Sequence, residues 1–489
     1  MIYTITSTLP LVHAGRTKAL LKRIKLYNND LNIAQNILTT NYNPNYSTVY
    51  KSFIDNNILD KDTHIINIYD WLSDFKLLNE EPLDIIEQKI RISNYNAKPD
   101  LKKNCKRYYD NDSNRYILYR QYYPNSKVIK FEDYFTEGVK HKSERWEYNE
   151  SGFLHKITNF SRKINKKIAE FFYDLEGNLY CKKFFEENEN NKLVNIVTYK
   201  NNIINKSFNN ENELFKYFFD SIFRKGDKVF NDARLLDKSL LQCEKDIKTI
   251  LVFHNSHVTE GELKNSYKYA LNNSDKVAKY YLLTEKQKIE IQNDFQIQDE
   301  KFAVIPHFIK PSNLVCEKKD QFIYLGRFSE EKQISHIIHA YKKFKETGYS
   351  TKLVLYGGTD DKSKNEIRNL IYDLDLEKDV EIHSFTDNPS KAFAESIASL
   401  LTSKYEGFAL TVMESINEGC PSISYDLKYG PSEIIENGVN GYLIEPNNIE
   451  KFAEAMVSIK KYPLKEVQTK NSLRYECAIK NLENLLADI

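Results

Sequence analysis

Two glutamates, Glu406 and Glu414, stand eight positions apart in the stretch KYEGFALTVMESINEG. The apolar run ASLLTS precedes this stretch and is typical of a buried strand, and the residues around Glu414 are typical of a short helix. Gly407 lets the backbone turn tightly between the strand and the helix. Carboxylates accept hydrogen bonds from hydroxyl groups, so one glutamate could hold a ribose and the other a second polyol.

The turn between the two glutamates also predicts an anion site. The first amides of a helix have no partner inside the helix, and the helix dipole favours negative charge at that end. The amides of Phe408, Ala409 and Leu410 occupy this place. The stretch therefore predicts a phosphate-binding turn with a carboxylate on either side.

A second loop supplies positive charge. Arg327 and Lys332 lie five positions apart in GRFSEEKQ, directly after the apolar run FIYL. The arginine fork grips phosphate oxygens, and lysine adds a point charge. Together the two cations could neutralise a diphosphate, including the charge that it gains as a leaving group.

The elements around both loops predict a doubly wound α/β domain. From residue 321 onward, short apolar runs alternate with helical patterns. Such alternation gives a parallel sheet, and ligands bind such sheets at the carboxyl ends of the strands. Both loops follow predicted strands, so we expect their side chains at that edge.

The N-terminal part repeats this pattern with an interruption. Residues 2–7 and 64–68 predict strands, Gly15 lies in a loop that opens into an amphipathic helix, and TILVFH and YYLLT predict two further strands. Between about 76 and 212 short aromatic runs alternate with polar turns, and YNESG and YDLEG are two similar hairpin turns. This insertion is therefore expected to form an antiparallel sheet.

The expected fold is α/β, with two Rossmann-like domains that face a cleft and a β-rich insertion in the first. The divisions are 1–75 and 213–308 for the N-terminal Rossmann-like domain on the acceptor side, 76–212 for the insertion, 309–470 for the C-terminal Rossmann-like domain and 471–489 for a helix that returns to the first domain.

Four segments together resemble the C-terminal half of the family-4 retaining glycosyltransferases, which have the GT-B fold. They are GRFSEEK, YEGFALTVMESINEG, PSISYDLKYGPSEII and GYLIEP, and the resemblance covers about residues 320–460. It implies that this half is the nucleotide-sugar domain. It also implies that Arg327 and Lys332 bind the donor diphosphate, that Glu414 binds the ribose, and that Glu406 lies near the transferred sugar.

The same resemblance assigns further residues. Gly15 of the HAGRT loop would lie beside the diphosphate. His254, at the end of TILVFH, matches the active-site histidine of the family, with His257 as the alternative. The base of the nucleotide would be bound by backbone near three residues, Ser384, Phe385 and Thr386.

The interrupted N-terminal half resembles a staphylococcal branch of the family. This branch contains the TarM-type teichoic-acid transferases and the Sdg-type transferases of serine–aspartate repeat proteins, and both types use UDP-N-acetylglucosamine (UDP-GlcNAc). The opening HAGRTKALLKRIKLY is closer to the Sdg type, which implies transfer of GlcNAc to serine hydroxyls. The alternative is α-GlcNAc transfer to poly(ribitol phosphate), although VFHNSHV lacks the adjacent histidine pair of TarM-type enzymes.

Retention in this fold implies no metal and no cofactor besides the donor. No carboxylate is clearly placed as a nucleophile, so we expect front-face transfer, in which the donor's own phosphate accepts the proton of the acceptor hydroxyl. Asp-x-Asp pairs occur, but none follows a strand of the second domain as a metal site would require. They are Asp60/Asp62, Asp110/Asp112 and Asp373/Asp375.

Two other functions are compatible with the fold. A non-catalytic GT-B partner subunit should lack the diphosphate cations and the two glutamates, and this sequence has all four. A nucleotide-sugar epimerase would have no use for a β-rich insertion, which suits a large acceptor or self-association.

Charge and composition limit the partners. The chain has 70 basic and 69 acidic residues, which gives no reason to expect a nucleic acid or a membrane surface. Residues 101–200 carry 20 basic and 14 acidic residues, so a basic sheet face could hold a long acidic acceptor. The aromatic sheet needs a cover for its apolar face, which predicts a homo-oligomer assembled through 76–212.

Nothing in the sequence predicts a membrane span or export. No apolar run is long enough to cross a bilayer, and MIYTITSTLPLVHAG lacks the basic start of a signal peptide. The six cysteines form no metal-ligand pattern and are expected to be reduced thiols. We therefore expect a cytoplasmic protein.

Overall fold

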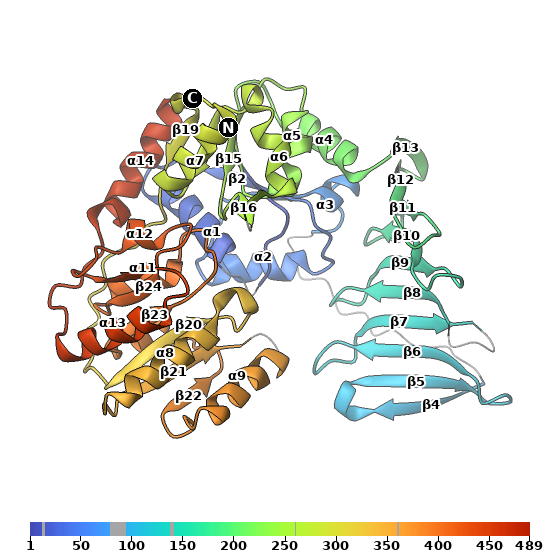
Figure 1. Ribbon diagram of the computed structural model, residues 1–489. Helices are drawn as coiled ribbons and strands as arrows, with labels where there is room; N and C mark the ends of the chain where they lie inside the picture. Colours follow the sequence, from blue (N-terminus) through green and yellow to red (C-terminus); the bar gives the residue numbers. More distant parts are fainter. Residues whose placement is uncertain (12–14, 79–93, 137–140, 260, 359–360) are drawn as a thin grey trace. The chain divides into compact units, whose positions relative to one another are not determined.

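The computed structural model divides into two compact units, Met1–Thr249 and Ile250–Ile489 (Figure 1). Within the residues that it describes, no helix is both long and apolar enough to cross a membrane. All six cysteines are described, and none forms a disulfide. The described residues are 1–11, 15–78, 94–136, 141–259, 261–358 and 361–489.

The first unit begins as an α/β structure. Four parallel strands lie side by side in the order β14-β1-β2-β3. Strands were predicted at β1 and β3, but β2 was missed because its sequence QNILT begins with two polar residues. The elements are β1 (Ile2–Thr6), α1 (Gly15–Asn29), β2 (Gln35–Thr39), α2 (Tyr46–Asp55), β3 (Ile65–Asn67), α3 (Ile68–Leu72), α4 (Glu211–Ile222), β14 (Lys228–Asn231) and α5 (Asp237–Leu241).

Between α3 and α4 the chain forms a ten-stranded antiparallel sheet. Each strand pairs with the next in sequence, so the sheet is a meander drawn as a single layer in Figure 1. It begins and ends inside the range 76–212, part of which lies outside the described residues. The strands are β4 (Tyr95–Asp100), β5 (Cys105–Asp110), β6 (Tyr116–Tyr122), β7 (Ile129–Phe135), β8 (Lys142–Tyr148), β9 (Leu154–Phe160), β10 (Lys167–Tyr173), β11 (Leu179–Phe185), β12 (Leu193–Lys200) and β13 (Ile203–Phe208).

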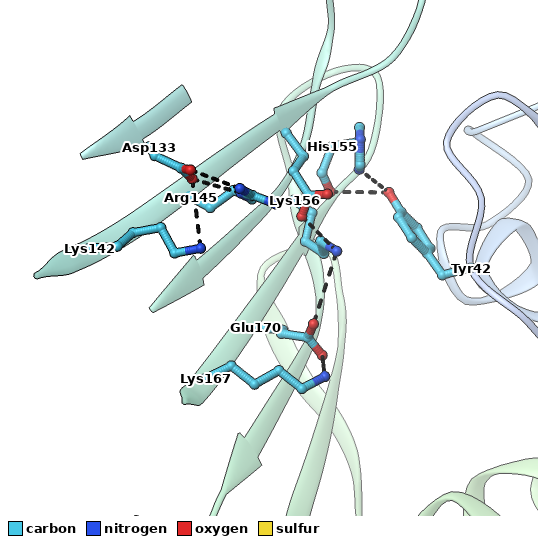
Figure 2. A network of polar contacts seen from close by, with 9 residues as sticks. Tyr42, Asp133, Lys142, Arg145, His155, Lys156, Lys167 and Glu170 are labelled. Atoms are coloured by element: carbon cyan, nitrogen blue, oxygen red, sulfur yellow. Dashed lines mark hydrogen bonds and ion pairs between the residues drawn. The ribbon is translucent and has the colours of Figure 1, made fainter. Parts of the chain in front are cut away.

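Part of this sheet is covered by the chain itself. The rings of Tyr42 and Tyr69 lie 5.0 and 5.3 Å from that of Phe172 on β10. The Tyr42 hydroxyl binds His155 Nδ1 on β9 at 2.5 Å, as Figure 2 shows, and Lys183 Nζ on β11 donates to the Tyr69 hydroxyl at 2.9 Å. A second copy was expected to cover the sheet, whereas β9–β11 pack on the loop after β2 and on α3 of their own unit.

Some charges of the sheet pair with one another, as in the network of Figure 2. Asp133 accepts from Arg145 at 2.7 Å and lies 4.0 Å from Lys142 Nζ, and Glu170 lies 3.1 Å from Lys167 Nζ. Around Asp133 and Glu170 the sheet therefore does not present a bare basic surface, because these carboxylates neutralise the neighbouring cations.

The second unit contains a six-stranded parallel sheet with the order β22-β21-β20-β23-β24-β25. Helix α8 buries an apolar face, on which the Phe344 ring lies 5.1 Å from that of Phe322 in β20. The elements are β20 (Gln321–Gly326), α8 (Ile334–Glu346), β21 (Lys352–Gly357), α9 (Asp361–Asp373), β22 (Val380–His383), α10 (Pro389–Ala394), β23 (Ala398–Leu401), α11 (Leu410–Asn417), β24 (Ser422–Tyr425), α12 (Pro431–Ile434), β25 (Gly441–Ile444), α13 (Ile449–Lys461) and α14 (Tyr475–Ala487).

The strands β15, β18 and β19 precede that sheet and run parallel to one another. Strand β15 begins in the last residues of the first unit, and the strands predicted at TILVFH and YYLLT are β15 and β18. The elements are β15 (Lys248–Val252), β16 (Val258–Thr259), β17 (Glu262–Leu263), α6 (Asn265–Leu271), β18 (Lys279–Leu282), α7 (Glu285–Phe295) and β19 (Phe302–Val304).

The buried contact between Tyr42 and His155 predicts a pH dependence of stability. Burial, and then the charge of Lys156, holds the pKa of His155 well below its usual range. In the unfolded chain the pKa is about 6.5, so at lower pH the unfolded state binds a proton that the folded state does not. The free energy of unfolding should be highest above that pH and fall by roughly 1.4 kcal/mol per unit below it.

Urea unfolding between pH 7.5 and 5 would measure this slope. His155→Gln should remove the histidine's part of it, while His64→Gln, at an exposed position, should leave the slope unchanged. Equal slopes in the wild type and in His155→Gln would show that His155 is not the titrating group.

Candidate functional site

Three neighbouring strands bring two predicted side chains, Arg327 and Glu406, and one that was not predicted, Lys428, to one edge of the second unit's sheet. Arg327 follows β20, Glu406 lies in the loop after β23, and Lys428 lies in the loop after β24. The strands are adjacent in the order β20-β23-β24 and run parallel. Their carboxyl ends therefore meet at the same edge, as expected for a ligand site in such a sheet.

Lys332 and Glu406 form an ion pair at this edge. Lys332 Nζ lies 2.6 Å from Glu406 Oε1, and the hydroxyl of Ser403 donates to the same oxygen at 2.7 Å. Both charged side chains are 16% exposed, so water competes weakly with the pair. The backbone carbonyl of Lys332 also accepts from Thr402 Oγ1 at 3.1 Å, which fixes the lysine to the end of β23.

Arg327 is held at its backbone and exposed at its side chain. Its carbonyl accepts from the Tyr324 hydroxyl at 2.8 Å. Its guanidinium is 59% exposed and lies 3.3 Å from Glu331, whose carboxylate also accepts from Ser329 Oγ at 2.6 Å. An exposed pair of this kind is weak, so the guanidinium can turn toward an anionic ligand at little cost.

The turn before α11 lies where the sequence predicted it, but its left-handed residue is Ala409 and not Gly407. Ala409 is in the left-handed region, with φ of 64°, and α11 begins at Leu410. Among the hydrogen bonds of the described residues, none is donated by the amides of Phe408, Ala409 or Leu410. Such amides at the start of a helix are suited to bind an anion.

Gly407 is required by a close approach of two backbones. A Cβ at this position would overlap the carbonyl oxygen of His254. The His254 ring is half-buried and stacks at 6.1 Å on that of His307, which packs edge-on against Phe408 at 5.2 Å. The structure therefore brings His254 to the loop that carries Glu406.

His257, the alternative histidine, is fully buried. Its ring stacks on Tyr429 with centroids 6.2 Å apart and planes within 10°. Burial lowers its pKa, and the nearby carboxylate of Glu290 only partly opposes this effect. These properties indicate a packing role for His257.

The other predicted residues lie at three separate places. Glu414 is the fifth residue of α11 and is half-buried. Gly15 begins α1 in the first unit, and the residues His13 and Ala14 before it lie outside the described residues. After β22 come the exposed Ser384 and Phe385, then the half-buried Thr386, whose hydroxyl accepts from the Asn388 amide at 3.1 Å.

Among the described residues, no group of three or more His, Cys, Asp or Glu side chains is arranged to hold a metal ion. At the first Asp-x-Asp pair, Asp60 accepts from the Asn28 side chain at 3.0 Å. At the second pair, Asp110 caps its own turn by accepting from Ser113.

Four other residues of the site were not predicted from the sequence. Ser403 and Tyr429 follow β23 and β24, so their place at strand ends was the available signal. His307 lies in the linker after β19, and Glu290 lies on α7, where no local pattern distinguishes it.

Two family profiles match the chain. The profile described as "Glycosyl transferases group 1" matches residues 307–474, and the profile described as "Glycosyl transferase 1 domain A" matches residues 3–200.

Two relatives match nearly the whole chain. The poly(glycerol-phosphate) alpha-glucosyltransferase of Bacillus subtilis (strain 168) is 27% identical over 481 residues, which cover 94% of this chain and 70% of that protein. The poly(ribitol-phosphate) alpha-N-acetylglucosaminyltransferase of Staphylococcus aureus (strain COL) is 26% identical over 478 residues, which cover 94% and 92%.

Two solved structures share the fold. A Staphylococcus aureus TarM variant in complex with Fondaparinux, alpha-GlcNAc-glycerol and UDP has a TM-score of 0.81 at 23% identity, covering 100% of this chain and 98% of that one. The pneumococcal O-GlcNAc transferase GtfA in complex with UDP and GlcNAc has a TM-score of 0.68 at 19% identity, with coverage of 100% and 98%. The predicted GT-B fold with an antiparallel insertion is thereby confirmed.

Proposed function

We propose that this GT-B glycosyltransferase of group 1 transfers a hexose, with retention of configuration, from a UDP-sugar to hydroxyl groups of a long phosphate-containing polymer. The donor expected from the sequence is UDP-GlcNAc. A UDP-glucose donor is compatible with the Bacillus subtilis relative, which is named as a glucosyltransferase.

One observation carries this proposal: Lys332 and Glu406 pair at 2.6 Å beside the unbonded amides at the start of α11. A cation and helix amides suit the diphosphate of a nucleotide sugar. A carboxylate next to them suits sugar hydroxyls. Arg327 adds a second cation, and Glu414, one turn into α11, would bind the ribose.

In the proposed reaction the acceptor oxygen bonds to C1 of the sugar while the bond from C1 to the diphosphate oxygen breaks. The bonding electrons leave with UDP, and the proton of the acceptor hydroxyl passes to a donor phosphate oxygen. Arg327 and Lys332 would stabilise the charge that develops on the diphosphate. Glu406 and His254 would hold the sugar, and catalysis would come from positioning and charge stabilisation.

The acceptor is proposed from the relatives. Both are named for polyol phosphate polymers and match 94% of this chain, so we propose such a polymer before the serine hydroxyls first expected. Their names also specify α-linkages, which agrees with retention from an α-linked UDP-sugar. Serine hydroxyls stay the second candidate, because GtfA, which shares the fold, is named an O-GlcNAc transferase.

A homo-oligomer through the insertion stays part of the proposal. The last strand of the ten-stranded sheet exposes Ile203 at 71% and Ile204 at 65%, and β4 at the other edge is also exposed. Exposed apolar edge strands favour pairing with another chain. Light scattering should give a multiple of the 57.5 kDa protomer mass, and a monomer would contradict this part.

The function itself is tested with labelled UDP-GlcNAc and UDP-glucose. Each donor is offered with poly(ribitol phosphate), poly(glycerol phosphate) or a serine–aspartate repeat peptide. We expect label in a polyol phosphate polymer and no effect of EDTA. Arg327→Ala and Lys332→Ala should each lower turnover by about 10²-fold or more, because each removes charge stabilisation in the transition state.

Lys343→Ala is the matched control. Lys343 lies near the end of α8 and pairs with Glu450, so its variant should keep full activity. Label in the peptide alone would show that the acceptor is a serine hydroxyl and would reject the polymer as acceptor. No label in any acceptor would reject the transferase function, and loss of activity in EDTA with recovery in manganese would reject the metal-free mechanism.

A further inference from the structure

Glu290, on α7, binds two neighbouring residues of the loop after β24. Its Oε1 lies 2.6 Å from Lys428 Nζ, and its Oε2 accepts from the Tyr429 hydroxyl. Tyr429 is fully buried and the Glu290 side chain is 24% exposed, so these charge-assisted contacts are partly shielded from water. The Glu290 carboxylate thus binds the side chains of both Lys428 and Tyr429 to α7.

The backbone of the same dipeptide holds Glu406. The Glu406 amide donates to the Lys428 carbonyl at 3.2 Å, and the Tyr429 amide donates to the Glu406 carbonyl at 3.0 Å. Both backbone hydrogen-bonding groups of Glu406 are therefore used by the two residues that Glu290 binds. Its carboxylate is left to Lys332 and Ser403.

Helix α7 also supports the other side of this loop. Gln287 Nε2 donates to the Asn255 carbonyl at 3.0 Å. Asn255 and the preceding His254 form the backbone against which Gly407 packs. Two side chains one turn apart on α7 thus reach both segments that border Glu406 and Gly407.

The groups around Tyr429 keep its hydroxyl available as a donor. Burial raises the pKa of Tyr429, and its short contact with Glu290 acts in the same direction. The stacked His257 has a pKa lowered by burial, with Glu290 and Asp294 opposing and Lys264 and Lys428 adding to the effect. A neutral hydroxyl can therefore donate to the Glu290 carboxylate throughout the neutral range.

We propose that Glu290 and Tyr429 form a clamp that positions Glu406 for sugar transfer. Neither residue needs to touch the substrate. The clamp fixes the backbone of Glu406, and Lys332 and Ser403 then orient its carboxylate. The inference rests on the proposed function, in which Glu406 lies beside the transferred sugar. Small displacements of such groups cost up to about 10²-fold in rate.

The first test is the kinetics of Tyr429→Phe and Glu290→Gln. Phenylalanine keeps the buried ring and removes only the hydroxyl, and glutamine weakens the pairing with Lys428. We expect kcat to fall about tenfold or more in each variant, with the Kd for UDP within about threefold of the wild type. Tyr341→Phe is the matched control, since it also removes a buried hydroxyl, one that donates to the Thr351 carbonyl.

A double-mutant cycle separates positioning from general stability. In a Glu406→Gln background, Tyr429→Phe should lower kcat by less than twofold, because the positioned carboxylate is already absent. A tenfold fall in that background would overturn the clamp as a device for Glu406.

Hydrogen exchange of the peptide 404–410 tests the clamp without the reaction. Tyr429→Phe should speed its exchange at least fivefold while Tyr341→Phe leaves it unchanged, because the Glu406 amide bonds to Lys428. Unchanged exchange in Tyr429→Phe would overturn the clamp, whatever the activity. A wild type that transfers no sugar would overturn the proposed function alone, and the exchange result would still decide the clamp.

Discussion

The ion pair between Lys332 and Glu406 joins two loops that are 74 positions apart in the sequence, and the site depends on it. The two side chains meet only because β20 and β23 are neighbours in a parallel sheet. Removing one partner would leave the other charge poorly solvated. In the proposed reaction the same lysine also faces the donor diphosphate, so donor binding and the position of Glu406 are linked through one ammonium group.

The loop that carries Glu406 is fixed mainly by backbone contacts. Gly407 lies against His254, and Gly430, with φ of 107°, lies against the Phe408 carbonyl, where a side chain would clash. The loop is thus enclosed by the chain after β15 and by the chain after β24. This enclosure explains why the turn can leave the amides at the start of α11 open for a ligand while the backbone of Glu406 stays fully bonded.

The sequence was sufficient to predict where side chains at the ends of strands would lie. The positions of Arg327, Lys332 and Glu406 could be predicted because each follows an apolar run, and their meeting at one edge is a consequence of parallel strands. Strand β2 was missed because it begins with two polar residues, although four of its five residues are buried. Glu290 could not be found, because its role depends on which face of α7 contacts the loop after β24.

Composition was the weakest guide in the ten-stranded sheet. Counting charges gave a basic region, but a count contains no information on pairing, and the structure places carboxylates of Asp133 and Glu170 among the cations. Likewise, the aromatic content gave an apolar face without showing what covers it. Tyr42, from the loop after β2, and Tyr69, from α3, cover part of that face.

The configuration of the new glycosidic bond is the most direct test of front-face transfer at this site. Proton NMR of a polyol phosphate acceptor after reaction with an α-linked UDP-sugar would give the coupling between H1 and H2 of the transferred hexose. Front-face transfer predicts the small coupling of an α-linkage, because the acceptor attacks from the face that the diphosphate leaves. The large coupling of a β-linkage would show inversion and would contradict the proposed roles of Arg327, Lys332 and Glu406.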